Sequence, residues 1–154
     1  MTNRTSPVSE IMHPDFVALH PGDTVETAMR TLVDHNIDAA PVTEADGTLL
    51  GMLSNTDLIV QEAQLHFPTL ISILGASIEI GHKRFDEDLT AALASEVSQI
   101  MTDDPVSCED TDTVETVATR MHDNDIGLIP VVRDGRVVGT VARNDILKAI
   151  LSSP

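Results

Sequence analysis

The chain repeats itself, and this duplication restricts its fold more than any other feature. Residues 8–42 align with residues 97–131 without a gap, residues 47–59 align with residues 135–147, and more than a third of the paired positions are identical. A unit of about 50 residues cannot bury two helices and a sheet alone, so the copies are expected to pack on each other. We divide the chain into a first unit (8–60), a helical, apolar insertion (61–96) and a second unit (97–151).

Each unit has the same predicted order: an Ile-Met opening, a strand, a helix, two strands and a second helix. The first helix follows a capping-box pattern, in which the N-cap oxygen of Asp23 or Asp112 is paired with Glu26 or Glu115 three residues later. An apolar stripe at helical spacing is then expected to face a core. Its members are Val25, Ala28, Met29, Leu32 and Val33 in one copy, and Val114, Val117, Ala118 and Met121 in the other.

Two β-rich segments follow in each copy, at residues 39–43 and 49–53 and at residues 128–133 and 137–141. Turns containing Gly47 and Gly135 join them as hairpins. The last strand then leads into a helix that begins with a carboxylate, at what we call the first corner (residues 51–58) and the second corner (residues 139–146). The pattern predicts an α+β fold with pseudo-twofold symmetry.

Charge and composition limit the possible partners. The net charge of -16, with nine scattered basic residues, argues against nucleic acid and against anionic membranes. Such an acidic surface is typical of halophilic proteins. The apolar tract at residues 67–81 is interrupted and shorter than the ~20 residues that span a bilayer. With one cysteine, Cys108, and no signal segment, the chain is expected to be cytoplasmic.

The sequence shows no sign of catalysis. It has no nucleophile with a base at a recognisable spacing, no Gly-rich phosphate loop, and six histidines without metal-ligand spacing. We therefore expect neither an enzyme nor a metal site.

The duplicated Ile-Met openings, the Ile-x-x-x-Pro-Val stretches and the Gly-x-x-Ser-x-x-Asp corner together resemble a pair of CBS (cystathionine β-synthase) domains. The resemblance implies two β-α-β-β-α units that meet through their sheets as a Bateman module and leave two clefts. It also implies a regulatory adenosine ligand, AMP, ADP, ATP or S-adenosylmethionine, rather than a cofactor. Such pairs usually form disc-like dimers, so a homodimer is expected.

The family motif places a hydroxyl residue and an aspartate at the corner, here Ser54 and Asp57 in the first copy. A carboxylate is an acceptor that can take both hydrogens of a ribose diol. The same pair is also what an ordinary helix N-terminus looks like, with the serine as cap. The second copy has Ala142 in place of the serine and keeps Asp145, which capping explains less well. Arg143 either reaches a phosphate or is a solvated surface residue.

The adenine slot is expected from the first strand and from the segment leading to Pro-Val, although all these residues fit a plain core equally well. An acid at Asp38 should repel phosphates, so the second cleft is the better candidate. The slot residues are Val17, Ala18, Ile37, Asp38, Ala39 and Ala40 in the first cleft, and Val106, Ser107, Ile126, Gly127, Leu128, Ile129 and Pro130 in the second.

Two functions follow from this reading. In the first, an adenosine ligand changes the packing of the two units or of two subunits, and a regulated protein reads the change. The alternative is a ligand-free dimerisation or scaffold module with vestigial clefts, favoured by Ala142 and Asp38.

Overall fold

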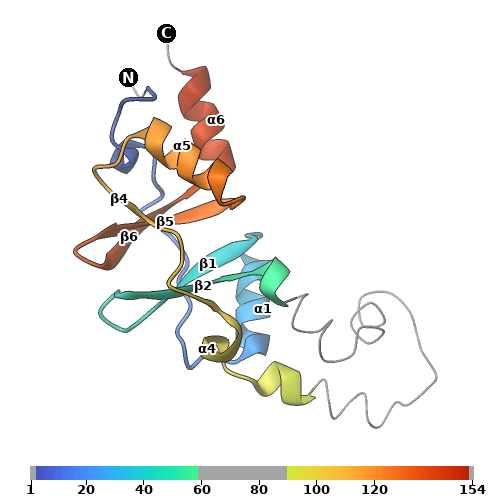
Figure 1. Cartoon of the computed structure of the whole chain (residues 1–154). Helices are drawn as coiled ribbons and strands as arrows, with labels where there is room; N and C mark the ends of the chain where they lie inside the picture. Colours follow the sequence, from blue (N-terminus) through green and yellow to red (C-terminus); the bar gives the residue numbers. More distant parts are fainter. Residues whose placement is uncertain (1–2, 59–89, 153–154) are drawn as a thin grey trace, which may run out of the picture.

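Two small sheets face each other across the centre of the molecule, and helices cover their outer sides (Figure 1). A computed structural model describes residues 3–58 and 90–152. Most of the predicted insertion, residues 61–96, lies outside these ranges. The two-sheet arrangement confirms the predicted α+β fold.

The first sheet contains three antiparallel strands in the order β1-β2-β3. Helix α1 lies on its outer side, and the chain is helical again at residues 55–58, directly after β2. The segment before α1 contributes only an isolated parallel bridge between Leu19 and Val42. The bounds are α1 (Val25–Asp34), β1 (Ala39–Thr43), β2 (Leu49–Ser54) and β3 (Thr102–Asp103).

The second sheet has the order β4-β5-β6, with β4 parallel and β6 antiparallel to β5. Helices α5 and α6 cover its outer side (Figure 1). Asp134 and Gly135, both at positive φ, form the two-residue turn between β5 and β6. The bounds are β4 (Cys108–Glu109), α5 (Val114–Asp123), β5 (Leu128–Arg133), β6 (Arg136–Ala142) and α6 (Arg143–Leu151).

The two repeats exchange their opening segments. The short 3-10 helix η1 (Val8–Glu10) packs on the second repeat, where Val8 is fully buried among Cys108, Val114 and their neighbours. Helix α4 (Val97–Ile100) packs on the first repeat in the same way, because Val97 is buried in the core of Leu19 and Val25. A sequence repeat is therefore not a self-contained structural unit, since each core is completed by the opening of the other copy.

The hairpin turns also connect the repeats. The Leu49 N–H donates to the Gly135 carbonyl at 3.1 Å, and the Val137 N–H donates to the Gly47 carbonyl at 3.0 Å. With β1 lying beside β5, these bonds fix the two sheets relative to each other.

The N-caps of the first helices lie one residue later than predicted. Thr24 accepts a hydrogen bond from the Thr27 N–H, and Thr113 accepts one from the Thr116 N–H. The predicted caps, Asp23 and Asp112, instead accept from the backbone three residues earlier and close the preceding turn. The prediction of an Asp–Glu capping box was wrong because the aspartates are used one turn earlier.

One residue of the predicted apolar stripe does not face the core. Val25, Ala28 and Leu32 are buried and Met29 packs against them, but the side chain of Val33 is 77% exposed. His122, which occupies the same position in the second repeat, is exposed as well. The core-facing stripe is therefore narrower than the sequence indicated.

Candidate functional site

At the first corner, the Asp57 carboxylate fixes the turn from β2 into the following helical residues. Its Oδ2 accepts from the Ser54 N–H at 3.0 Å and from the Ser54 hydroxyl at 3.1 Å, while Ser54 Oγ lies 3.2 Å from the Asp57 N–H. In the described part of the chain, both hydrogen bonds to this carboxylate end on Oδ2. Asp57 therefore serves as a cap and keeps Oδ1 available as an acceptor.

At the second corner, both oxygens of the Asp145 carboxylate are engaged. Oδ2 accepts from the Ala142 N–H at 2.8 Å, and Oδ1 lies 2.7 Å from Nε2 of His13. The Asp145 side chain is 10% exposed and that of His13 is 60% exposed. The loss of the serine thus leaves the capping role of the aspartate in place, which removes the argument that Asp145 persists for ligand binding alone.

The contact of Arg143 with Gly127 at the second corner corresponds to the contact of Asn55 with Asp38 at the first. The Arg143 N–H donates to the Gly127 carbonyl, and the Arg143 guanidinium lies over Gly127 and pairs with the exposed Asp125 at 3.4 Å. In the first repeat the Asn55 N–H donates to the Asp38 carbonyl, and its side-chain amide lies 3.4 Å from the Asp38 carboxylate. One corner thus carries an exposed cation where the other carries an exposed anion.

The predicted slot residues lie beside the corners, in two classes. Pairing of Cys108 with Val131 places Val106 and Ser107 along the start of β5, and pairing of Leu128 with Ala142 joins the same strand to the second corner. Ala40, Ile129 and Pro130 are fully buried in the core, so their side chains cannot line an open slot. Of the rest, Asp38 and Gly127 are exposed; the half-buried ones are Val17, Ala18, Ile37, Ala39, Val106, Ser107, Ile126 and Leu128.

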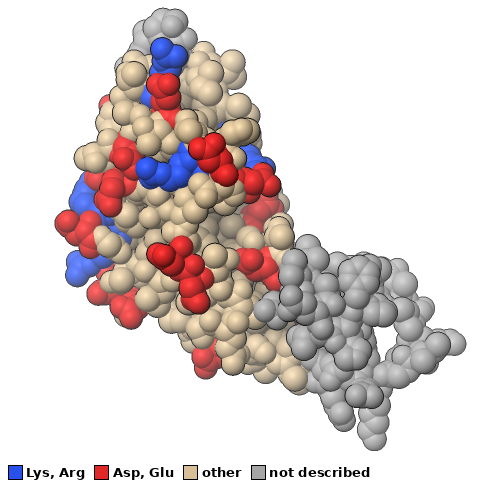
Figure 2. All heavy atoms as spheres, in the orientation of Figure 1, with Lys and Arg blue, Asp and Glu red and all other residues tan. Residues whose placement is uncertain are grey.

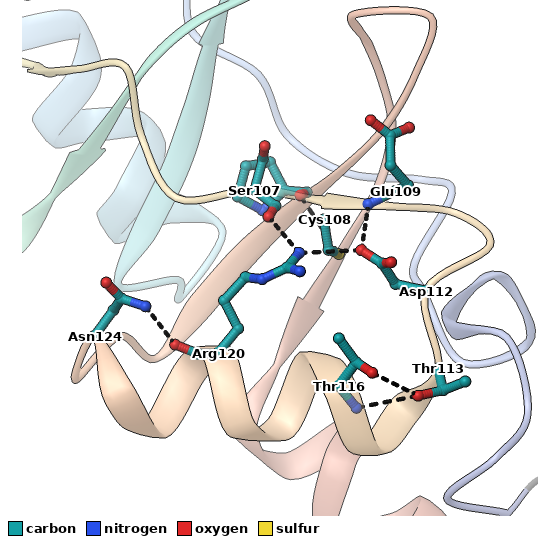
Figure 3. Close-up of polar contacts among 9 residues, drawn as sticks. Ser107, Cys108, Glu109, Asp112, Thr113, Thr116, Arg120 and Asn124 are labelled. Carbon is teal, nitrogen blue, oxygen red and sulfur yellow. Dashed lines mark hydrogen bonds and ion pairs between the residues drawn. The ribbon is translucent and has the colours of Figure 1, made fainter.

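Arg120 ties α5 to the first strand of the second repeat (Figure 3). Its Nη1 donates to the Ser107 carbonyl at 2.9 Å and to the Asp112 carboxylate at 3.0 Å. Arg120 also lines an open hollow of about 460 Å³ on α5, together with Glu115, Thr116, Thr119, Asp123 and Asn124. The hollow contains none of the predicted site residues, whereas the Arg120 bond holds the backbone of one of them.

The Cys108 thiol beside Arg120 is buried and unreactive. Its sulfur lies 3.8 Å from the Pro130 carbonyl, and the residue is 2% exposed. Burial raises the pKa of the thiol to about 12, so it stays protonated at neutral pH.

Acidic side chains are spread over the visible face of both repeats, with basic ones among them in the upper part (Figure 2). Within residues 3–58 and 90–152, no group of three or more His, Cys, Asp or Glu side chains could hold a metal ion. No helix in this part of the chain is long and apolar enough to cross a membrane.

The sequence reasoning missed His13. Its equivalent in the second repeat is Thr102, so the duplication gives no sign of a histidine at a corner. The contact arises only because the opening segments are exchanged, and it joins residues 132 positions apart.

The CBS domain family model matches residues 8–62 and 97–152. Protein MJ1426 of Methanocaldococcus jannaschii is 28% identical over 94% of this chain and 90% of its own length. The solved CBS domain of a CBS domain-containing membrane protein from Sphaerobacter thermophilus is 27% identical with a TM-score of 0.71, covering 97% of this chain and 91% of that one. CBSX2 of Arabidopsis thaliana, solved in complex with AMP, is 22% identical with a TM-score of 0.71, covering 94% and 95%.

Proposed function

We propose, from the premise that this chain belongs to the CBS domain family, that it is a regulatory module that binds adenosine ligands at its two corners. The observation that carries the proposal is the position of Asp57 and Asp145, each in the first helical turn after a strand and near half-buried apolar residues. A carboxylate there accepts the hydrogens of a ribose diol, and the half-buried residues offer the adenine an apolar surface. The AMP complex of CBSX2, which shares the fold, supports this ligand class.

The two corners suit different ligands. The first corner has an acceptor at Asp57 Oδ1 but carries the exposed Asp38, whose charge opposes a phosphate. It favours an adenosyl ligand without phosphates, and above all a cationic one such as S-adenosylmethionine. The second corner carries Arg143, and the ion pair of this residue with Asp125 is exposed and weak, so the guanidinium is free to turn toward a phosphate of AMP, ADP or ATP.

In this proposal the protein acts through a change in the packing of its two repeats rather than through catalysis. A ligand at either corner contacts a strand, a helix start and the opening segment of the other repeat. Binding therefore changes how tightly the exchanged segments hold the two repeats together. A regulated protein, or a second copy of this chain in a homodimer, reads that change.

One observation favours the alternative, a ligand-free dimerisation module. Asp145 is fully engaged by Ala142 and His13, so the second corner is complete without a ligand. The first corner favours ligand binding, because Oδ2 of Asp57 makes the capping contacts while Oδ1 stays open to a ligand.

Isothermal titration calorimetry with AMP, ATP and S-adenosylmethionine tests the proposal. We expect saturable heat from at least one ligand, lost or weakened in Asp57→Asn or Asp145→Asn. Glu44→Gln is the control, because it removes one charge from the exposed β1–β2 turn and leaves both corners intact. Absence of heat from all three ligands would refute the proposal and leave the dimerisation module.

A further inference from the structure

His13 lies at a position where it can decide whether the second corner accepts a ligand. Its Nε2 lies 2.7 Å from Oδ1 of Asp145, the carboxylate oxygen that does not cap α6. The Asp145 side chain is nine-tenths buried, whereas most of the imidazole is exposed. The carboxylate is thus fixed, and the imidazole has room to move.

Backbone contacts fix His13 at this corner. The His13 N–H donates to the Thr140 carbonyl at 2.8 Å, and the Thr140 N–H donates back to the His13 carbonyl at 3.2 Å. Met12 packs against Gly139 on the same strand, leaving no room for a side chain at that glycine. The histidine therefore belongs to the second corner through the architecture and not through a chance side-chain contact.

The first corner provides an internal comparison. Thr102 pairs with Met52 as His13 pairs with Thr140, so the two residues occupy equivalent positions. Among the described residues no hydrogen bond joins Thr102 to Asp57, and Oδ1 of Asp57 stays available. At this position the second corner thus has an imidazole in contact with the Asp145 carboxylate, and the first corner has a short hydroxyl side chain that leaves Oδ1 of Asp57 free.

We propose that His13 is a specificity-determining residue that competes with the ligand for Asp145, so that the two corners of one chain differ in affinity. This inference rests on the proposed function, since it assigns the competition to the oxygen that takes the ribose hydroxyls. A hydrogen bond between an imidazole and a carboxylate is charge-assisted and stronger than a neutral one. A ribose must replace it at the second corner, while at the first corner the ribose meets an open acceptor.

The variants that test the inference exchange the two equivalent residues. In an Asp57→Asn background, which isolates the second corner, adding His13→Thr should tighten AMP binding about tenfold, equal to about 1.4 kcal/mol. In an Asp145→Asn background, which isolates the first corner, adding Thr102→His should weaken AMP or S-adenosylmethionine binding by a similar factor. Thermal melts of each variant confirm folding, and His13→Asn is a second substitution if His13→Thr does not fold.

A third combination separates an effect at the second corner from an effect on the whole fold. His13→Thr added to Asp145→Asn should leave AMP binding unchanged within about twofold, because the remaining binding is at the first corner, which His13 does not contact. Nitrogen NMR of the full chain gives an independent readout: the Nε2 signal of His13 should shift when AMP is added to the wild type.

The possible outcomes separate the role of His13 from the proposed function. Equal AMP affinity with and without His13→Thr in the Asp57→Asn background, or the same tightening in the Asp145→Asn background, would overturn the role of His13 and leave the proposed function standing. No binding of AMP, ATP or S-adenosylmethionine to the wild type or to any variant would overturn the proposed function and this inference with it.

Discussion

Met12 lies directly over Gly139, so that a Cβ added at the glycine would be 2.7 Å from the methionine sulfur. Met101 and Gly51 form the same contact in the other repeat, where the added Cβ would also lie 2.7 Å from the Thr102 carbonyl oxygen. Each glycine is the first residue of a corner, and each methionine lies in the opening segment that comes from the other repeat. These two contacts explain why the Ile-Met openings and the corner glycines occur together in both copies.

Gly51→Ala should therefore destabilise the protein by about 1–3 kcal/mol, because the backbone of Thr102 must move to make room. Urea unfolding of the wild type and the variant measures the difference. Gly22→Ala is the matched control, since nothing lies within 4 Å of its added Cβ. Equal stability of Gly51→Ala and the control would contradict the exchanged arrangement.

Replacing Arg120 tests the link between α5 and the predicted slot. Arg120→Ala removes the bonds to the Ser107 carbonyl and to Asp112, and we expect a loss of about 1–2 kcal/mol because both groups are half-buried. Arg30→Ala breaks only an exposed pair with Glu26 on α1 and should cost less. Thermal or urea melts of both variants measure the difference, and an equal loss would show that Arg120 holds nothing together.

The buried Cys108 thiol should lower the free energy of unfolding at alkaline pH. Burial raises the pKa of the thiol from 9.0 to about 12 in the folded chain, so the unfolded chain releases this proton first. Stability should then fall as the pH rises from about 9 toward 12, by at most about 1.4 kcal/mol per pH unit. Urea melts between pH 8 and 10.5 measure the slope, and Cys108→Ala should lack this contribution. An identical slope in the variant would count against the buried thiol.

Asp38→Asn should make the first corner accept phosphates. Removing the carboxylate beside the corner lowers the repulsion, so AMP affinity in the Asp145→Asn background should rise about threefold at low salt and the gain should vanish in 1 M salt. Asp123→Asn removes the same charge from the exposed surface of α5 and should change little. Calorimetry at the two salt concentrations decides, and a gain that persists in 1 M salt would point to a cause other than charge.

Much of the fold could be predicted because local signals and the duplication agree. The strands at residues 39–43 and 128–133 begin and end where the sequence placed them. The exchange of the segments that contain Val8 and Val97 could not be predicted. The two repeats align with each other equally well whether each opening segment packs on its own repeat or on the other one. The contact of His13 with Asp145 follows from that exchange.

The candidate site was predicted less completely for a related reason. The aspartates lie at the two corners and most of the slot residues are half-buried, and their role in binding a ligand stays a prediction. Ile129 and Ala40 were expected in the slot but are core residues. The sequence could not show this, because both faces of these strands are packed and the residue pattern does not distinguish an open slot from a closed core. The preference for the second corner was based on Arg143 and on the charge of Asp38. No pattern in the sequence indicated the imidazole that engages Asp145.

A crystal structure of the wild-type chain grown with AMP would show directly whether the two corners bind the ligand. We expect ribose oxygens within hydrogen-bond distance of Oδ1 of Asp57 or Asp145, with the His13 imidazole turned away wherever Asp145 is the acceptor. AMP bound in the hollow on α5, or corners that stay empty with His13 still on Asp145 at saturating AMP, would contradict it.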